Sequence, residues 1–249
     1  MMKKLLRVEN LTKREILHQV TFDIDPGEMV AIMGPSGSGK STLLYNVAGM
    51  DQPTGGQVWL GDTELTKLSE DEKARLRLRR MGFVFQQMNM MANLDILDNI
   101  LLPASQAGRG RNRKSKEEQN LRARILMEKL GIAGLGERKI SQVSGGQLQR
   151  ACICRSMMNN PEILFADEPT GALNKSAAAE VMGELVKLNR EGTTILMVTH
   201  DSRIASQCDR IMYLLDGRIS SGLPLGKFVS GTERQREEQT ARWLMEMGW

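Results

Sequence analysis

Features that direct a chain out of the cytoplasm are scarce in this sequence. It contains only three cysteines, Cys152, Cys154 and Cys208, which fit no zinc-binding spacing and make no even disulfide set. A reducing cytoplasm is the simplest setting for such a set. No signal-peptide apolar stretch develops after Lys3 and Lys4, and no uncharged apolar run is long enough to cross a bilayer. We therefore expect a soluble chain that reaches any membrane through a partner.

Aromatic residues and net charge are also low. Phe, Trp and Tyr make up 4% of the 249 residues, and no aromatic residue precedes Phe22. The formal net charge of +4 is a mild basic bias, which permits contact with anionic lipid or nucleic acid without arguing for either. The length is sufficient for one large domain, or a domain with a lobe, around a real core.

A glycine-rich segment separates an apolar run from a helical pattern. Met29–Met33 has the composition of a buried strand, and the residues from Thr42 to Ala48 have that of a helix start. The intervening sequence has the spacing G-x-x-x-x-G-K-S, which in this context predicts a phosphate-binding loop. Backbone N–H groups would surround the anion, and the helix dipole would add to the attraction. The predicted nucleotide-binding residues are Gly34, Pro35, Ser36, Gly37, Ser38, Gly39, Lys40, Ser41 and Thr42.

Strand and helix signals elsewhere predict an α/β core interrupted by a helical lobe. Alternating residues at 4–8 and 18–24 indicate antiparallel strands, and Ser69 with Glu72 forms a capping box before a helix. Met81–Phe85, Ile163–Ala166 and Thr194–Val198 have the composition of buried strands, whereas residues 87–161 show helical spacing. Asp216 and Gly217 mark a hairpin turn. Strands alternating with helices imply a largely parallel sheet with ligands at its strand C-termini.

Further motifs occur in a fixed order along the chain. They are Gln86 after the strand Met81–Phe85, Ser144-Gly145-Gly146-Gln147, Asp167-Glu168, Thr170-Gly171-Ala172-Leu173 and His200. With the phosphate loop, this set strongly resembles the ATP-binding subunit of an ABC transporter over residues 3–223. The Phe83–Gln87 segment is most similar to the macrolide-exporter, lipoprotein-release and bacitracin-resistance (antimicrobial peptide) branch.

The resemblance implies a P-loop NTPase cassette. The ATPase domain would cover 1–223, with an N-terminal antiparallel β subdomain, a mostly parallel core from 1–86 and 162–223, and a helical subdomain at 87–161. Residues 224–249 would form a helical extension.

The chemistry of phosphoryl transfer agrees with these roles. Ser41, Gln86 and Asp167 would hold Mg²⁺, Glu168 would deprotonate the attacking water, and His200 would reach the γ-phosphate. Gln86 would also offer its amide to that water. A surface acid is the plainer interpretation of Glu168, but its place after an apolar strand and Asp167 favours the catalytic one.

The Ser144-Gly145-Gly146-Gln147 segment opens a helix and so makes a second anion-binding end. The resemblance implies that it closes over the ATP held by another copy, giving a head-to-tail dimer around two ATP molecules.

The expected partner is a membrane permease, which would place the chain at the cytoplasmic face of the membrane. Met88–Leu94 would contribute to the groove that receives the permease. Two alternatives use the same chemistry: a soluble ATPase acting on nucleic acid or the ribosome, and a mechanical regulator of cell-wall enzymes. The first usually carries a long coiled coil or a second cassette, which this chain lacks, so no nucleic-acid partner is expected.

Three regions depart from the family pattern or lie outside it. The N-terminal segment has no aromatic residue to stack on adenine, and Arg14 is the candidate replacement. Asn174 stands where the family usually has aspartate. The basic segment 108–114 is a solvated connection or an anionic-lipid contact. Beyond Pro224, a Thr232–Gln235 capping box would open a helix with an apolar stripe that contains Trp243. This stripe would pack on its own domain, or dock to a partner or the membrane surface.

Overall fold

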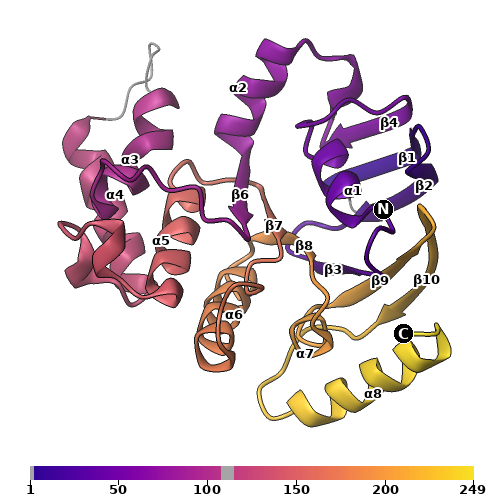
Figure 1. The fold of residues 1–249 in the computed structure, drawn as a ribbon. Coiled ribbons are helices and arrows are strands. Elements are labelled where there is room, and N and C mark those ends of the chain that lie inside the picture. The colour runs from indigo at the N-terminus through magenta and orange to yellow at the C-terminus, as the bar shows by residue number, and fades with distance from the viewer. Residues whose placement is uncertain (1–2, 108–114) are drawn as a thin grey trace. The chain divides into compact units, whose positions relative to one another are not determined.

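The computed structural model describes residues 3–107 and 115–249, so the basic segment 108–114 lies outside the described residues. The described chain forms two compact units (Figure 1). The first contains the residues up to Lys73 and from Leu188 onward, and the second runs from Ala74 to Lys187. Across the described residues, no helix has the length and apolar character that a bilayer crossing requires.

An antiparallel sheet in the first unit contains the N-terminal strands. Its order is β2-β1-β4-β5, and β1 pairs with both β2 and β4. One face is buried, including Val8, Val20 and Phe22, because alternate side chains of a strand point to the same side. The predicted antiparallel strands are therefore confirmed. The elements are β1 (Leu6–Lys13), β2 (Leu17–Ile24), β4 (Gly55–Leu60), β5 (Thr63–Glu64) and the short 3₁₀ turn η1 (Leu65–Lys67).

The first unit also contains four strands that are mainly parallel. β3 (Met29–Met33) pairs in parallel with β8 (Thr194–Val198) and β9 (Arg210–Leu215), and β10 (Arg218–Pro224) closes an antiparallel hairpin on β9. All five residues of β3 are buried, as is usual for a strand with parallel neighbours on both sides. The mostly parallel core and the hairpin were both predicted.

Three helices belong to this unit: α1 (Lys40–Val47), α7 (Ser202–Ala205) and α8 (Glu233–Glu246). α8 packs on its own unit, because Trp243 and Leu244 are buried and Trp243 contacts Tyr213 edge-on. The capping box predicted at Thr232 is wrong. The Thr232 hydroxyl donates to the Val229 carbonyl instead, and the Thr232 backbone is not in the extended conformation that an N-cap adopts.

α2 (Glu70–Arg80) leads from the first unit into the second. Its predicted capping box is confirmed, because the Ser69 amide donates to Glu72 Oε2 (2.9 Å) and the Glu72 amide donates to Ser69 Oγ (3.4 Å). The acidic residues of the first turn and the arginines of the last turn complement the helix dipole.

The second unit combines two parallel strands with a group of helices. β6 (Met81–Phe85) and β7 (Ile163–Asp167) pair in parallel, and α3, α4 and α5 pack on one another. The helical lobe predicted from the residue spacing is thus helical, although Leu121 and Ile125 of α4 are exposed rather than buried. All three cysteines are free and buried, and burial raises the pKa of Cys152 to about 11. The helical elements are α3 (Ile96–Ala107), α4 (Lys116–Lys129), η2 (Ala133–Leu135), η3 (Ile140–Gln142), α5 (Gly145–Met157) and α6 (Lys175–Arg190).

Candidate nucleotide site

The predicted phosphate loop connects β3 to α1 in the first unit. Gly39 is the N-cap of α1 and adopts a left-handed backbone conformation (φ 97°), which favours glycine. Gly37 is also left-handed (φ 80°), and a Cβ there would meet no atom within 4 Å, so this part of the loop is open. The loop therefore presents the start of a helix to an accessible space, which is the arrangement that binds phosphate.

Two contacts fix the rest of the loop. A Cβ on Gly34 would lie 2.0 Å from the Leu214 carbonyl oxygen, so no side chain fits where the loop leaves β3. Lys40 Nζ donates to the carbonyl oxygens of Gly34 and Pro35, each at 2.8 Å. The ammonium group thus lies across the loop, where it can exchange a carbonyl for a phosphate oxygen.

His200 lies at the same edge of the parallel strands as the phosphate loop. β3 and β8 are neighbours in register, with Ile32 opposite Val198, and the Thr199 amide donates to the Ile32 carbonyl (3.2 Å). His200 is exposed and is followed by Asp201, which caps α7 by accepting from the Arg203 amide at 2.8 Å. Partial burial pushes the pKa of Asp201 upward. Hydrogen bonds from Arg203 outweigh burial and hold this pKa below its ordinary value.

The second unit brings Gln86, Asp167 and Glu168 together at one strand edge. In the parallel register of β6 and β7, Phe85 lies opposite Asp167. Gln86 and Glu168 each follow one member of that pair. Asp167 is buried to 8% exposure, and Glu168 is half-buried. Glu168 has a left-handed backbone (φ 48°), which is uncommon for a residue with a side chain and is often found at functional sites.

Gly171 belongs to the Thr170–Leu173 motif, but the sequence did not indicate which residues it contacts. A Cβ at this position would lie 3.0 Å from Gln86 Nε2 and 3.4 Å from Glu168 Cβ. The Gln86 amide therefore lies over Gly171 and beside Glu168. The contact joins residues far apart in the chain, so no local pattern could have indicated it.

The Ser144 segment opens α5, as predicted, and its first two residues are exposed. The Ser144 hydroxyl accepts from the Gln147 amide (3.3 Å), and the Gln147 side chain accepts from the Ser144 amide (2.9 Å). This capping box leaves the amides of Gly145 and Gly146 at the helix start, where an anion would bind. A Cβ on Gly146 would lie 2.9 Å from Ala177 Cβ, so the segment is packed against the start of α6.

The N-terminal segment offers an aliphatic rather than an aromatic side chain to the phosphate loop. Ile16 is 39% exposed, and its Cγ2 would lie 3.1 Å from a Cβ on Gly39. The Arg14 side chain is 86% exposed and has only a loose ion pair with Glu15 (4.0 Å), so the structure gives no support for a base-stacking role of Arg14.

Two features define the class of this protein. One is the glycine-rich loop at the start of α1, and the other is the set of acidic and amide side chains at the ends of parallel strands. The chain is an α/β protein of the phosphate-loop nucleotide-binding type.

Comparison with known proteins identifies the family within that class. A family model described as ABC transporter matches residues 17–171, so the chain belongs to the ABC transporter family and is an ATP-binding cassette ATPase. The macrolide export ATP-binding/permease protein MacB of Agrobacterium fabrum is 42% identical over 229 residues, which cover 89% of this chain and 35% of the relative. The probable syringafactin export ATP-binding/permease protein SyfD of Pseudomonas syringae is 40% identical and covers 88% of this chain and 34% of its own. The predicted branch is thereby confirmed.

Solved structures support the same fold. The dimeric structure of the ABC transporter cassette MJ0796 has a TM-score of 0.80 and 40% sequence identity, covering 90% of this chain and all of that one. The present chain spans about a third of the curated relatives that it matches.

Proposed function

We propose that this chain is the ATP-hydrolysing subunit that drives a membrane permease of the export or extraction type. Its cargo would be an antimicrobial peptide, a lipid or a drug. The observation that carries the proposal is the match of most of this chain to about a third of proteins named as export ATP-binding/permease proteins. We propose that the ATPase domain covers residues 1–223, with the helical subdomain at 87–161 and an extension at 224–249.

The phosphate loop would hold the triphosphate of ATP. Lys40 would exchange its bonds to Gly34 and Pro35 for bonds to phosphate oxygens, and the amides of 34–42 would surround the anion. The aliphatic Ile16 beside the loop is available to pack against the base.

Mg²⁺ would be held by Ser41, Gln86 and Asp167. A hydroxyl, an amide and a carboxylate supply the hard oxygen ligands that this ion prefers. Phosphate oxygens and water would supply the remaining ligands, because Mg²⁺ usually keeps several waters and binds substrate phosphates. Bound Mg²⁺ neutralises charge on the phosphates during transfer.

Glu168 would act as the general base toward water, with Gln86 orienting the same water and His200 contacting the γ-phosphate. The supporting observation is the strand-end position of all three residues, with Gln86 beside Glu168 in the second unit. Binding alone would not need a carboxylate at Glu168, whereas proton abstraction does.

The Ser144–Gln147 segment would complete the ATP site of a second copy. Its exposed helix start can accept a phosphate from another molecule, and the related MJ0796 cassette has been solved as a dimer. Two copies in a head-to-tail pair would then enclose two ATP molecules. Closure would be favoured by ATP because only the closed pair contacts each γ-phosphate from both sides.

The permease would dock on the segment Met88–Leu94, which would keep the chain at the cytoplasmic face of the membrane. Met91 is 52% exposed, and flexible methionine suits an adaptable docking surface. The segment is held by Arg155, which donates to the carbonyls of Met88 and Asn89 (2.8 Å each). We expect no nucleic-acid partner.

Glu168→Gln tests the proposal, with the exposed Glu128→Gln on α4 as a control of equal charge change. With Mg²⁺ and ATP, the Glu168 variant should form a persistent dimer in light scattering and release no phosphate, whereas the control should hydrolyse ATP at the parent rate. Affinity purification from membranes should recover a multi-span permease. Parent-rate hydrolysis by the Glu168 variant would remove this residue from its proposed role.

A further inference from the structure

Arg236 is a buried cation that neither the sequence patterns nor the proposed chemistry uses. It lies on α8 and is 6% exposed, although arginine is rarely buried without a specific reason. Its guanidinium donates to backbone carbonyls: Nε to Ser206 (2.7 Å), Nη2 to Cys208 (2.6 Å) and Nη1 to Leu225 (2.9 Å). Further bonds reach Gly226, from Nη1 at 3.2 Å and from Nη2 at 3.1 Å.

Two of these carbonyls belong to the far end of α7. Ser206 is the C-cap of α7, and Cys208 follows two residues later. Both residues are almost completely buried, so water cannot easily replace the arginine as donor. α7 has only four residues and is capped at its start by Asp201. Its two ends are therefore held by the Asp201 cap and by Arg236.

His200 precedes this helix directly. On one side Thr199 is fixed to β3 through its amide, and on the other the Asp201 amide donates to Thr199 Oγ1 (3.1 Å). His200 lies between Thr199 and Asp201, so a shift of α7 along its axis would move Asp201 and with it the backbone of His200.

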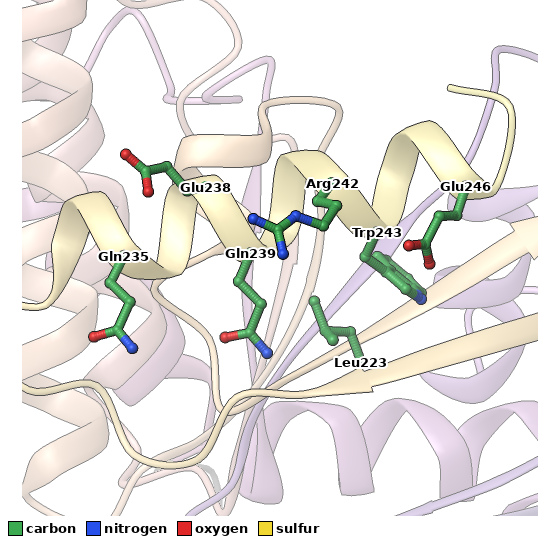
Figure 2. A pocket seen from close by; sticks show the side chains of 7 residues that line it. All are labelled: Leu223, Gln235, Glu238, Gln239, Arg242, Trp243 and Glu246. Carbon is green, nitrogen blue, oxygen red and sulfur yellow. The ribbon is translucent and has the colours of Figure 1, made fainter.

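α8 can hold α7 because its own C-terminal half is anchored to the first unit independently of Arg236. Trp243 lies toward the other end of the helix, where it contacts Tyr213 and donates through Nε1 to Ser221 Oγ (3.3 Å). Between the helix and β10 lies a groove of about 420 Å³, which Leu223 and Trp243 border (Figure 2). In this view Gln235 and Gln239 project from α8 toward the strand, while Glu238 points away. Because that contact is incomplete, the bonds of Arg236 are a main attachment of α8 on the α7 side.

We propose that Arg236 is a positioning residue that fixes His200 through α7. The inference rests on the role proposed above for His200 at the γ-phosphate. Without the guanidinium, the carbonyls of Ser206 and Cys208 would lose buried donors, and α7 would have to move to satisfy them. His200 would then leave the position from which it contacts the nucleotide, while the phosphate loop would be unchanged. Turnover should therefore fall more than nucleotide affinity.

The histidine content provides a direct probe, because the chain contains only His18 and His200. The test uses the full chain with labelled histidine, and His18→Gln assigns the two ring signals in the NMR spectrum. The variants are Arg236→Met, the conservative Arg236→Lys, and Arg234→Met as a control on the same helix. The Arg234 side chain is 93% exposed and pairs with Glu238.

Arg236→Met should shift or broaden the His200 signal, leave that of His18 in place, and lower kcat by about tenfold with KM changed less than about twofold. Arg236→Lys should restore part of both effects, because an ammonium can still donate to one or two of the carbonyls. Arg234→Met should behave as the parent.

An unchanged His200 signal and kcat in folded Arg236→Met would overturn the inference. The His18 signal reports whether Arg236→Met is folded. If it is not, Arg236→Lys provides the test, and a His200 signal and a kcat equal to those of the parent would overturn the inference. A parent protein without ATPase activity would instead refute the proposed function, and the NMR shift would still test the link between Arg236 and His200.

Discussion

Replacing Gly171 by alanine tests whether the observed position of Gln86 is its working position. The added Cβ would lie 3.0 Å from Gln86 Nε2 and 3.4 Å from Gln86 Cδ. Comfortable contacts between non-bonded heavy atoms begin at about 3.5 Å, so the amide must move by roughly half an ångström or more. Gly171 is exposed and its backbone is not left-handed, so alanine itself introduces no strain.

The expected costs for folding and for catalysis differ. The Gln86 amide is the far end of a flexible, exposed side chain, so the fold can absorb its displacement at little cost in unfolding free energy. Catalysis depends on orientation, and misplacing a catalytic group by about 1 Å can reduce the rate about 100-fold. A shift of half that size should lower kcat by about 10-fold, which corresponds to about 1.4 kcal/mol in the activation barrier.

The assay compares kcat with the unfolding free energy in urea, and Gly183→Ala serves as the matched control. Gly183 lies within α6, and a Cβ there would meet no atom within 4 Å. The control should keep its kcat and gain about 0.5–1 kcal/mol of stability from the better helix propensity of alanine. If Gly171→Ala retained the parent kcat within about twofold, the observed contact between Gln86 and Gly171 would not be the catalytic arrangement.

Two further predictions concern stability. The Thr240 hydroxyl is fully buried and has no hydrogen-bond partner among the described residues, so Thr240→Val should raise the unfolding free energy in urea by about 1 kcal/mol, and a decrease would contradict this. A hydrogen bond from Lys13 (2.7 Å) is the main cause that holds the pKa of Asp51 below its ordinary value, against the opposing effect of burial. This stabilisation is present above the unfolded-state pKa and is lost as the pH falls through the folded-state pKa. The stability advantage of the parent over Asp51→Asn should therefore shrink in acid, and an advantage that grew there would show that the carboxylate is not stabilised by Lys13.

The strands could be predicted from the sequence because buried strands appear in it as short apolar runs. Met29–Met33 and Met81–Phe85 have the bounds that the composition indicated. All five residues of β3 are buried because it has parallel neighbours on both sides, whereas β6 ends the strand order beside β7 and is buried at three of its five residues. The capping box predicted at Ser69 is confirmed and the one predicted at Thr232 is wrong, although both segments match the sequence pattern of a capping box. A capping box also needs an extended N-cap backbone, which packing decides.

Contacts between polar groups that lie far apart in the chain could not be predicted from the sequence. Arg236 lies among residues that look like a solvated helix face, and only the carbonyls that α7 presents explain its burial. Periodicity separates apolar from polar positions, but it does not distinguish a buried cation from an exposed one. Burial within α4 shows the same limit of periodicity, because Leu121 and Ile125 fit the helical period but are exposed.

The loop that follows Glu168 links motifs that the sequence presented as separate. Gly171 contacts Gln86, Leu173 Cδ2 would lie 3.3 Å from a Cβ on Gly145, and Ala177 contacts Gly146. The Asn174 side chain accepts from the Ala177 amide (2.9 Å), so the residue that departs from the family pattern caps α6 beside the Ser144 segment.

A substitution in the Ser144 segment therefore changes more than the contact with phosphate that we propose for it. Ser144→Ala would also remove the cap of α5, at a cost of about 1 kcal/mol, and any side chain on Gly146 would press on the first turn of α6. Loss of dimerisation in either variant would have two causes, one within the subunit and one between subunits. The two causes separate only when the stability of the single copy is measured alongside dimerisation. A variant that loses the dimer at unchanged monomer stability is the one that reports on the phosphate contact.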